Sequence, residues 1–219
     1  MSDSAASPPT PPTRRPRGPR LKPADRRALI LAAATEVFSE AGYQRGKMSE
    51  VARRVGVSEP VVFQNFGSKA AVFAAVLEHA AAQLDAALRE WAGRSPSVGA
   101  WLTELLAPGH LTQVHARGTL GVLFDDAMTL TAEPLVLDAA RQGNRRVAEA
   151  LADLLAQGQR DGSIRADLSP ETGAWWLISL LASQRYRFAV VPEPGLREGE
   201  LGELMVRSLL ADGARADGA

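Results

Sequence analysis

The sequence contains no cysteine and only three histidines among its 219 residues. Without cysteine, a disulfide framework, a thiolate nucleophile and a metal site built on sulfur are excluded. Three histidines leave little for a nitrogen-based metal site, so we expect neither a metal nor a cofactor. No stretch approaches the ~18 consecutive apolar residues that span a bilayer. No apolar segment of a secretory signal follows the N-terminal arginines. We therefore expect a soluble, cytoplasmic protein with no membrane partner.

Signatures of catalysis are also missing. His110 and His115 stand five residues apart, whereas a helical metal-binding pair is four apart. Asp125 and Asp126 are adjacent, so their carboxylates would point to different faces of a helix. The sequence has no glycine-rich phosphate loop and no nucleophile elbow. It predicts no catalytic residues, and therefore a protein that is not an enzyme.

Charge is unevenly distributed along a chain whose formal net charge is zero. Residues 1–70 contain 12 Lys and Arg against 6 Asp and Glu, and residues 71–219 contain 13 against 19. This asymmetry indicates a polyanionic partner for the first part. Residues 1–23 hold 7 of the 14 prolines and a basic run, and we expect them to be disordered. They fit either an arm that contacts phosphate or a minor groove, or a solvated tail.

Helical spacing of apolar residues begins at residue 24, and no strand pattern competes with it. Ile30, Ala34, Val37 and Phe38 share one helical face, and Gly42 supplies a stop. We expect further helices over 48–55, 58–65, 68–93, 96–107, 111–130, 134–161, 170–190 and 196–211. The predicted fold is all-α, with a first domain over 24–69, a larger domain over 70–212 and a disordered tail over 213–219.

The segment from Met48 to Phe66 has the pattern of a helix-turn-helix. Ala52 and Gly56 are four residues apart, and this motif needs a small residue where its helices cross and a glycine with positive φ in its turn. Four apolar residues occupy the surrounding inward positions, namely Val51, Val55, Val57 and Val62. We expect Val62 and Phe66 to be covered, with the outer side of residues 58–66 exposed.

Residues 30–69 resemble the DNA-binding domain of the TetR family of transcriptional regulators. The resemblance is carried by Phe38, Gly42, Tyr43, Val51, Ala52, Gly56, Val57, Ser58, Phe63, Phe66, Gly67, Ser68 and Lys69. It implies an N-terminal three-helix helix-turn-helix domain, joined by a long helix to a C-terminal domain that binds an effector and dimerises. The function implied is that of a repressor, which binds a palindromic operator as a homodimer and is released by a small molecule.

The resemblance also assigns residues to the DNA. Phe63 stands where the family commonly has Tyr, Asn65 where it often has His, and Lys47 where it usually has Thr. Gln64 can bond adenine, and Val61 can touch a thymine methyl. Gln64 and Arg45 also fit solvated side chains, and Glu59 fits a residue that stabilises a helix N-terminus. The expected DNA-binding residues are Arg45, Lys47, Ser58, Glu59, Pro60, Val61, Phe63, Gln64, Asn65 and Lys69.

The C-terminal domain is expected to hold an interface and a pocket. Helix 170–190 is apolar on nearly every side, so it fits a four-helix bundle shared by two subunits or a central core helix. The expected interface residues are Trp175, Leu180, Leu181, Leu201, Met205 and Leu209. The expected effector is a small apolar or aromatic molecule, because aromatic residues and a methionine fit an apolar site, although they also fit an ordinary core. The candidate pocket residues are Trp101, Leu105, His110, Phe124, Met128 and Trp176.

Two other functions fit the sequence. One is a DNA-binding dimer with no effector, whose C-terminal domain only dimerises. The other is a helical protein-interaction module that has lost affinity for DNA, an alternative left open by Phe63 and Lys47. A cavity in the C-terminal domain would argue against the first, and salt-dependent binding to DNA would exclude the second. A regulator of the expected kind would associate with the nucleoid.

Overall fold

The computed structural model describes residues 22–114, 120–130, 132–191 and 193–211. Most of the predicted basic arm, the predicted tail over 213–219 and His115 lie outside these ranges. The described residues are helical apart from short connections and one isolated antiparallel bridge, between Ile164 and Leu210. The predicted all-α fold class is confirmed. The helices are α1 Pro23–Arg45, α2 Met48–Val55, α3 Glu59–Phe66, α4 Lys69–Arg94, α5 Val98–Leu105, α6 Pro108–Val114, α7 Gly121–Met128, α8 Pro134–Arg160, α9 Pro170–Ala182, α10 Gln184–Val190 and α11 Pro194–Leu209.

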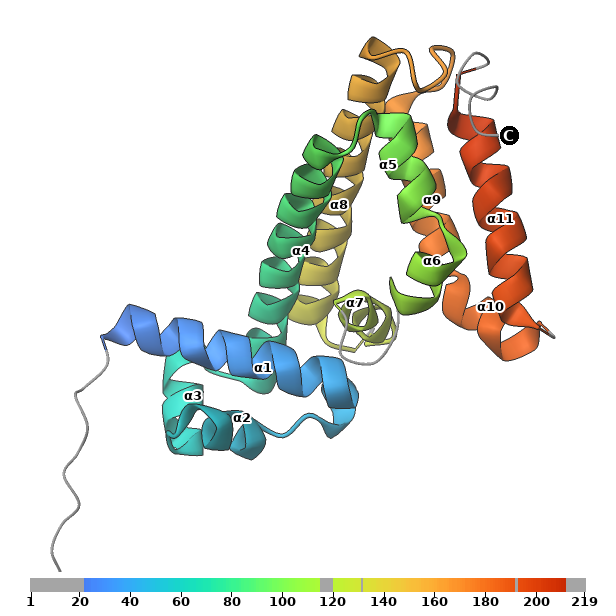
Figure 1. Cartoon of the computed structure of the whole chain (residues 1–219). Helices are drawn as coiled ribbons and strands as arrows, with labels where there is room; N and C mark the ends of the chain where they lie inside the picture. Colours follow the sequence, from blue (N-terminus) through green and yellow to red (C-terminus); the bar gives the residue numbers. More distant parts are fainter. Residues whose placement is uncertain (1–21, 115–119, 131, 192, 212–219) are drawn as a thin grey trace, which may run out of the picture.

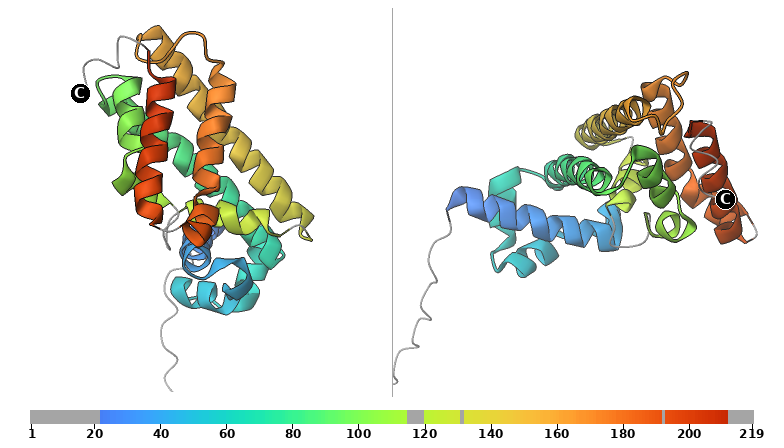
Figure 2. Two further views of the ribbon diagram at one scale, coloured as in Figure 1. Left: turned by 90° about the vertical axis from the view of Figure 1, so that its right-hand side faces the viewer. Right: turned by 45° about the horizontal axis from the view of Figure 1, so that its top comes forward.

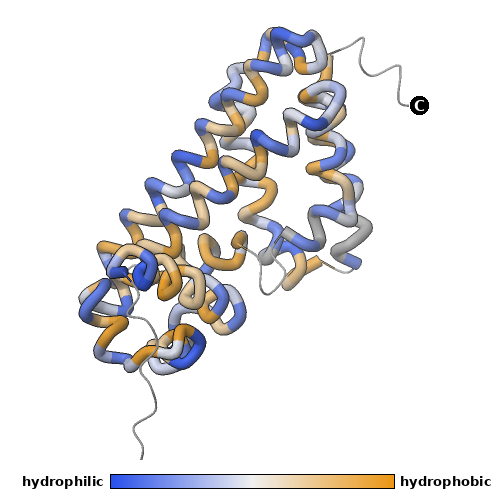
Figure 3. Tube along the Cα trace, turned by 60° about the vertical axis from the view of Figure 1, so that its left-hand side comes forward, coloured by the Kyte–Doolittle hydropathy of each residue, from blue (hydrophilic) through white to orange (hydrophobic). Residues whose placement is uncertain are grey.

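The molecule has a small head and a larger body, joined by α4 (Figure 1). The head consists of α1, α2 and α3. In the body, α4 and α8 lie side by side, and α5, α6, α9 and α11 stand on one side of this pair (Figures 1 and 2). Helix α7 lies between the head and the body. Along the long helices, apolar and polar residues alternate within each turn (Figure 3), as expected of helices with one buried face.

The buried apolar residues form two cores, one that spans the head and the adjoining end of the body and one within the body. The first core joins α1–α4 to α7 and the start of α8, and its largest fully buried side chains include Phe38, Phe73 and Leu77. The second core joins the far end of α4 to α5, α8, α9 and α11 around Trp101 and Leu155. Because α7 contributes Leu123 to the first core, the head is packed against the body.

Two glycines set the path of the chain in the head. Gly56 has φ 76° and forms the left-handed turn between α2 and α3, as the helix-turn-helix pattern predicts. Gly42 has φ 75° and ψ 171°, so the helical conformation of α1 is interrupted there. The predicted stop at Gly42 is therefore a kink, after which the chain continues to Arg45.

Helix α4 corrects the expectation about apolar length. Residues Lys69–Arg94 are long and apolar enough, by length and composition alone, to cross a membrane. Much of the helix is buried in the protein, including Val72, Phe73, Val76 and Leu77, which pack in the first core. Its apolar character is explained by contact with α1 on one side and α8 on the other.

Two of the predicted helices are each divided in the structure, and one predicted capping bond is not formed. The helix expected over 111–130 is two helices, α6 and α7, and the one expected over 170–190 divides at Ser183 into α9 and α10. The Ser183 hydroxyl donates to the Ser179 carbonyl, a bond that bends helices. The Arg187–Glu198 ion pair then ties α10 to α11. Ser58 precedes α3 as predicted, but its side chain makes no capping hydrogen bond.

Candidate nucleic-acid interface and ligand cavity

Helix α3 presents its outer side to solvent. Val62 is completely buried, and Phe66 is half-buried and packs against the first core, as predicted. Phe63 is also half-buried against this core. This packing explains how a phenylalanine fits where the family commonly has tyrosine. The exposed side chains at the start of α3 and along it are Ser58, Glu59, Pro60 and Gln64. An exposed short helix with a buried inner side has the form of a recognition helix.

The end of α3 is held by the start of α1. The Arg27 guanidinium lies over the Phe66 ring, 3.9 Å from its centroid, and the same group donates to the Asn65 carbonyl. The Asn65 side-chain amide donates to the Val61 carbonyl within its own helix at 2.7 Å. Both the backbone carbonyl and the side-chain amide of Asn65 are thus hydrogen-bonded within the protein. For the amide to bond a phosphate, its bond to the Val61 carbonyl must first break.

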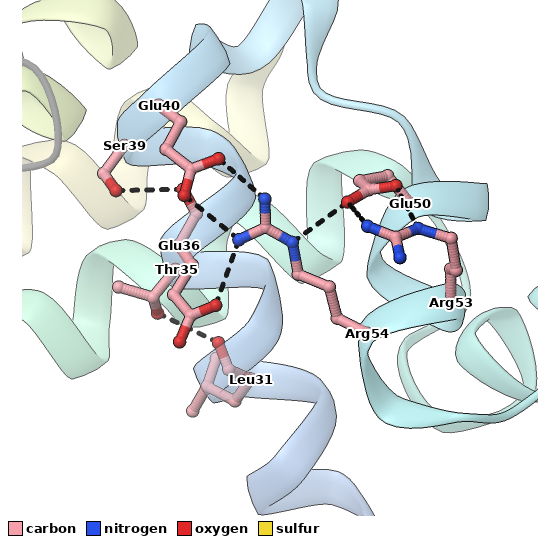
Figure 4. A network of polar contacts seen from close by, with 8 residues as sticks. All are labelled: Leu31, Thr35, Glu36, Ser39, Glu40, Glu50, Arg53 and Arg54. Carbon is pink, nitrogen blue, oxygen red and sulfur yellow. Dashed lines mark hydrogen bonds and ion pairs between the residues drawn. The ribbon is translucent and has the colours of Figure 1, made fainter.

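An ion-pair network fixes α2 against α1 (Figure 4). The Arg54 guanidinium contacts Glu36 at 3.0 Å, Glu40 at 2.7 Å and Glu50 at 3.1 Å. Arg53 shares Glu50 at 2.6 Å. Hydrogen bonds from Arg53 and then Arg54 lower the pKa of Glu50 to about 2. Arg54 therefore acts as a clamp between the two helices, and its charge is already neutralised.

The three cations of the head that were predicted to contact DNA have different surroundings. Lys47 is exposed at the start of α2. Arg45 is exposed, and its Nε donates to the Ala41 carbonyl at 3.2 Å. The Lys69 ammonium donates to the Gln44 carbonyl at 3.1 Å and lies 4.7 Å from the centroid of the Tyr43 ring. These contacts tie the lysine to the end of α1, and its burial there lowers the pKa of Lys69.

The body contains a cavity of about 780 Å³ that is lined by residues of α4, α5, α6, α7, α8 and α9. This volume lies in the range of small-molecule sites, roughly 300–1,000 Å³. Four of the six predicted pocket residues line it, namely Leu105, His110, Phe124 and Met128. The ring of His110 lies 5.0 Å from that of Trp91, and burial lowers the pKa of this imidazole.

The structure does not place the other two predicted pocket residues at the cavity. Trp101 is completely buried in the second core, where its ring packs edge-on against Trp91. Trp176 is 43% exposed and lies on the outside of α9, while Trp175 lines the cavity. Three polar residues of α8 that were not predicted from the sequence also line the cavity, namely Arg141, Asn144 and Arg145. Their spacing of three and four residues places them on one face of α8, and this was the available signal.

The predicted dimer interface also needs correction. Met205 and Leu209 are buried in the second core, so a partner cannot reach them. Leu181, like Trp175, lines the cavity, and Leu180 and Leu201 are half-buried. The large apolar side chains exposed on the described part of α9–α11 are Trp176, Tyr186, Phe188, Val190 and Leu204, together with Trp175, which also borders the cavity. Figure 2 (left) looks onto this part of the body, where α9 and α11 lie side by side.

Helix α7 contacts both the cavity and the head. Phe124 and Met128 line the cavity, whereas Asp126 accepts a hydrogen bond from the backbone N–H of Tyr43 in α1. Tyr43 also donates through its hydroxyl to Glu133 at 3.3 Å. Burial, followed by the negative charge of Glu133, raises the pKa of Tyr43. These bonds connect the kink at Gly42 to α7 and the residue that precedes α8, and α7 lines the cavity.

Comparison with known proteins agrees with this geometry. The family model described as "Bacterial regulatory proteins, tetR family" matches residues 30–76. The chain is 43% identical over 74 residues to the HTH-type transcriptional activator FasR of Mycolicibacterium smegmatis, a match that covers 34% of each protein. It is 26% identical to the uncharacterized regulator YdgC of Bacillus subtilis, over 89% of this chain and 97% of that one. The structure of E. coli NemR in its reduced form has a TM-score of 0.69 at 21% identity, over 85% and 97% of the two chains.

An exposed recognition helix on a helix-turn-helix head, joined to a helical body, defines a DNA-binding transcriptional regulator. Residues 30–76 match the TetR family of these regulators, and the chain shares its fold with a solved TetR-family regulator from Agrobacterium tumefaciens. The curated relatives that the chain matches are named as transcriptional regulators. Because the match to FasR spans only a third of that protein, the partners and effector of this chain are matters of proposal.

Proposed function

We propose that the chain forms a homodimer that binds a palindromic operator and represses transcription there. One α3 helix from each subunit would enter the major groove of one half-site. The observation that carries the proposal is the exposed outer side of α3 above a completely buried Val62. The excess of cations over carboxylates in residues 1–70 supports the same surface, because phosphate contacts supply much of the affinity for DNA.

Residues of the head would divide between bases and phosphates. Gln64 and Val61 are the proposed base contacts, since an exposed glutamine can bond adenine and a valine can meet a thymine methyl. Lys47, Arg45 and Ser58 would contact phosphate, and all three are exposed. Contacts to phosphate place the protein on the duplex but carry no sequence information.

Dimerisation is proposed through the exposed apolar side chains of α9–α11. Trp176 is 43% exposed and Leu204 is 54% exposed, and large apolar side chains gathered on one side of a soluble protein mark an interaction surface. A second copy of the chain would cover them by packing its own α9 and α11 against these helices.

A small molecule bound in the cavity is proposed to weaken operator binding. The cavity of about 780 Å³ favours this proposal over a dimer with no effector. Helix α7 would transmit the change, because it walls the cavity and also bonds Tyr43. An effector that binds more tightly to the conformation in which the two heads do not fit the half-sites must lower the affinity for DNA. By reciprocity, DNA must lower the affinity for the effector by the same factor.

Selection from a random pool of duplex DNA tests the proposal. We expect enrichment of an inverted repeat whose half-site centres are about 34–36 Å apart or a multiple of that spacing. A reporter gene behind the selected site should then be repressed in cells, where we place the protein in the cytoplasm at the nucleoid. A pool without enrichment, and with no salt-dependent binding, would instead support the protein-interaction module. Increased reporter expression would show that this chain, like FasR by its name, is an activator.

A further inference from the structure

The cavity has an apolar interior and a polar mouth. Its buried or half-buried lining is almost entirely apolar, including Leu84, Leu88, Leu105, Phe124, Leu151 and Ile178. The lining residues that are exposed mark where the cavity meets solvent. These are Gln113, Met128, Arg141, Arg145, Trp175 and Ala182. A ligand would therefore place its apolar part inside and one polar end between α7, α8 and α9.

The mouth carries positive charge. Arg141 and Arg145 stand one turn apart on α8, and no aspartate or glutamate of the described chain lines the cavity. Arg145 has no ion-pair partner among the described residues. Arg141 contacts Asp138 at 3.3 Å, but both side chains are largely exposed, so this pair is weak and easily exchanged. The two guanidinium groups are thus available to an incoming anion.

We infer that the cavity takes an amphipathic anion, with an extended apolar body and one carboxylate or phosphate bound by Arg141 and Arg145. A guanidinium group offers a planar pair of donors that matches both anions. The apolar interior provides the affinity for the body, and the arginines select the head group. This inference rests on the proposed effector function and names the chemical class of the effector.

The test is calorimetric titration of the full-length protein, without DNA, with four ligands that share a ten-carbon chain. The ligands are decanoate, decyl phosphate, decanol and decyltrimethylammonium. We expect at least one anion to bind about tenfold more tightly than decanol, the size of one charge-assisted contact, and the cation to bind most weakly. The preferred anion then identifies the head group as carboxylate or phosphate.

Paired variants assign the preference to the two arginines. In Arg141→Gln/Arg145→Gln, we expect anion affinity to fall about tenfold while decanol affinity stays the same. The matched control is Arg94→Gln/Arg160→Gln, which removes the same charge from exposed residues that do not line the cavity. It should leave all four affinities unchanged.

Three results would overturn the inference: decanol binding as tightly as both anions, an equal loss of anion affinity in the control, or no binding of any of the four ligands. Binding is measured without DNA, so failure to bind an operator does not affect the result. If an anion binds through the arginines but leaves operator affinity unchanged, this inference stands and the proposed effector release fails.

Discussion

The Asp126 carboxylate, on α7, accepts a hydrogen bond from the backbone N–H of Tyr43, near the end of α1. This N–H is available because Gly42 leaves the helical conformation, so the regular bonding of α1 is interrupted at the kink. On the same short helix, Phe124 and Met128 line the cavity. The bond from Tyr43 to Asp126 and the apolar contacts around it therefore join the wall of the cavity to the DNA-binding head.

Removing this carboxylate should loosen the head. For Asp126→Ala, we expect the free energy of unfolding to fall by about 2 kcal/mol, as for other bonds to a charged acceptor. The Tyr43 amide should lose protection from hydrogen exchange. Urea unfolding and exchange at this amide are the measurements. The control is Asp153→Ala, because Asp153 is 66% exposed in a surface ion pair and should change stability by less than about 1 kcal/mol. Unchanged exchange at Tyr43 in Asp126→Ala would show that the bond does not secure the kink.

The exposed side of α9–α11 predicts which substitutions separate the subunits. Trp176→Glu/Leu204→Glu should give a folded monomer, because both side chains are exposed in one subunit and charge prevents their burial against a partner. Leu209→Glu should instead unfold the chain or destabilise it by about 3 kcal/mol or more, because Leu209 is completely buried in the second core. Sedimentation velocity and circular dichroism distinguish these outcomes. A dimer that survives the double substitution would place the interface elsewhere.

The helix-turn-helix could be predicted from the sequence because its signals are local. Ala52, Gly56 and the surrounding valines lie within a few residues of one another, and each is explained by the geometry of a single turn. The roles of Trp175 and Trp176 could not be assigned in this way. Helix 170–182 is apolar on nearly every side, so its sequence contains no polar face to show which tryptophan borders the cavity.

The same limit applies to the last helix and to the cavity. Leu204 and Met205 are neighbours of similar character, and only the packing of α11 against α5 and α6 decides that Met205 is buried and Leu204 exposed. Arg141 and Arg145 were missed because a polar face on α8 has the same pattern whether it meets solvent or a cavity. Both outcomes depend on packing between helices that are distant in the sequence, and a local sequence pattern does not determine it.

The network around Arg54 makes a prediction about pH. Hydrogen bonds from Arg53 and Arg54 hold the pKa of Glu50 at about 2, below its ordinary value of 4.5. Since the pKa is lowered in the folded protein, this carboxylate stabilises the fold fully above pH 4.5, and the contribution is lost as the pH falls toward 2. Carboxyl chemical shifts should show Glu50 titrating near pH 2, and nearer its ordinary value in Arg53→Gln. A native Glu50 that titrates near 4.5 would contradict the network.

Lys47 and Lys69 should differ in their effects on DNA binding. Lys47 is exposed, so Lys47→Gln should reduce the slope of log affinity against log salt concentration by about 0.9, the loss of one phosphate contact. The ammonium of Lys69 already bonds the Gln44 carbonyl. We therefore expect Lys69→Gln to lower stability more than Lys47→Gln does, and to change the salt slope less. Fluorescence anisotropy with operator DNA at several salt concentrations measures the slopes, and a larger slope change for Lys69→Gln would reverse the assignment.

The central claim is that the outer side of α3 determines which DNA sequence is bound. Repeating the random-pool selection with Gln64→Ala tests it most directly, because Gln64 is exposed and its removal leaves Val62 and the core intact. We expect the selected repeat to lose its preference at one symmetric position in each half-site, with a cost of about 1–3 kcal/mol for the original operator. A variant that selects the same sequence with the same affinity would contradict the claim.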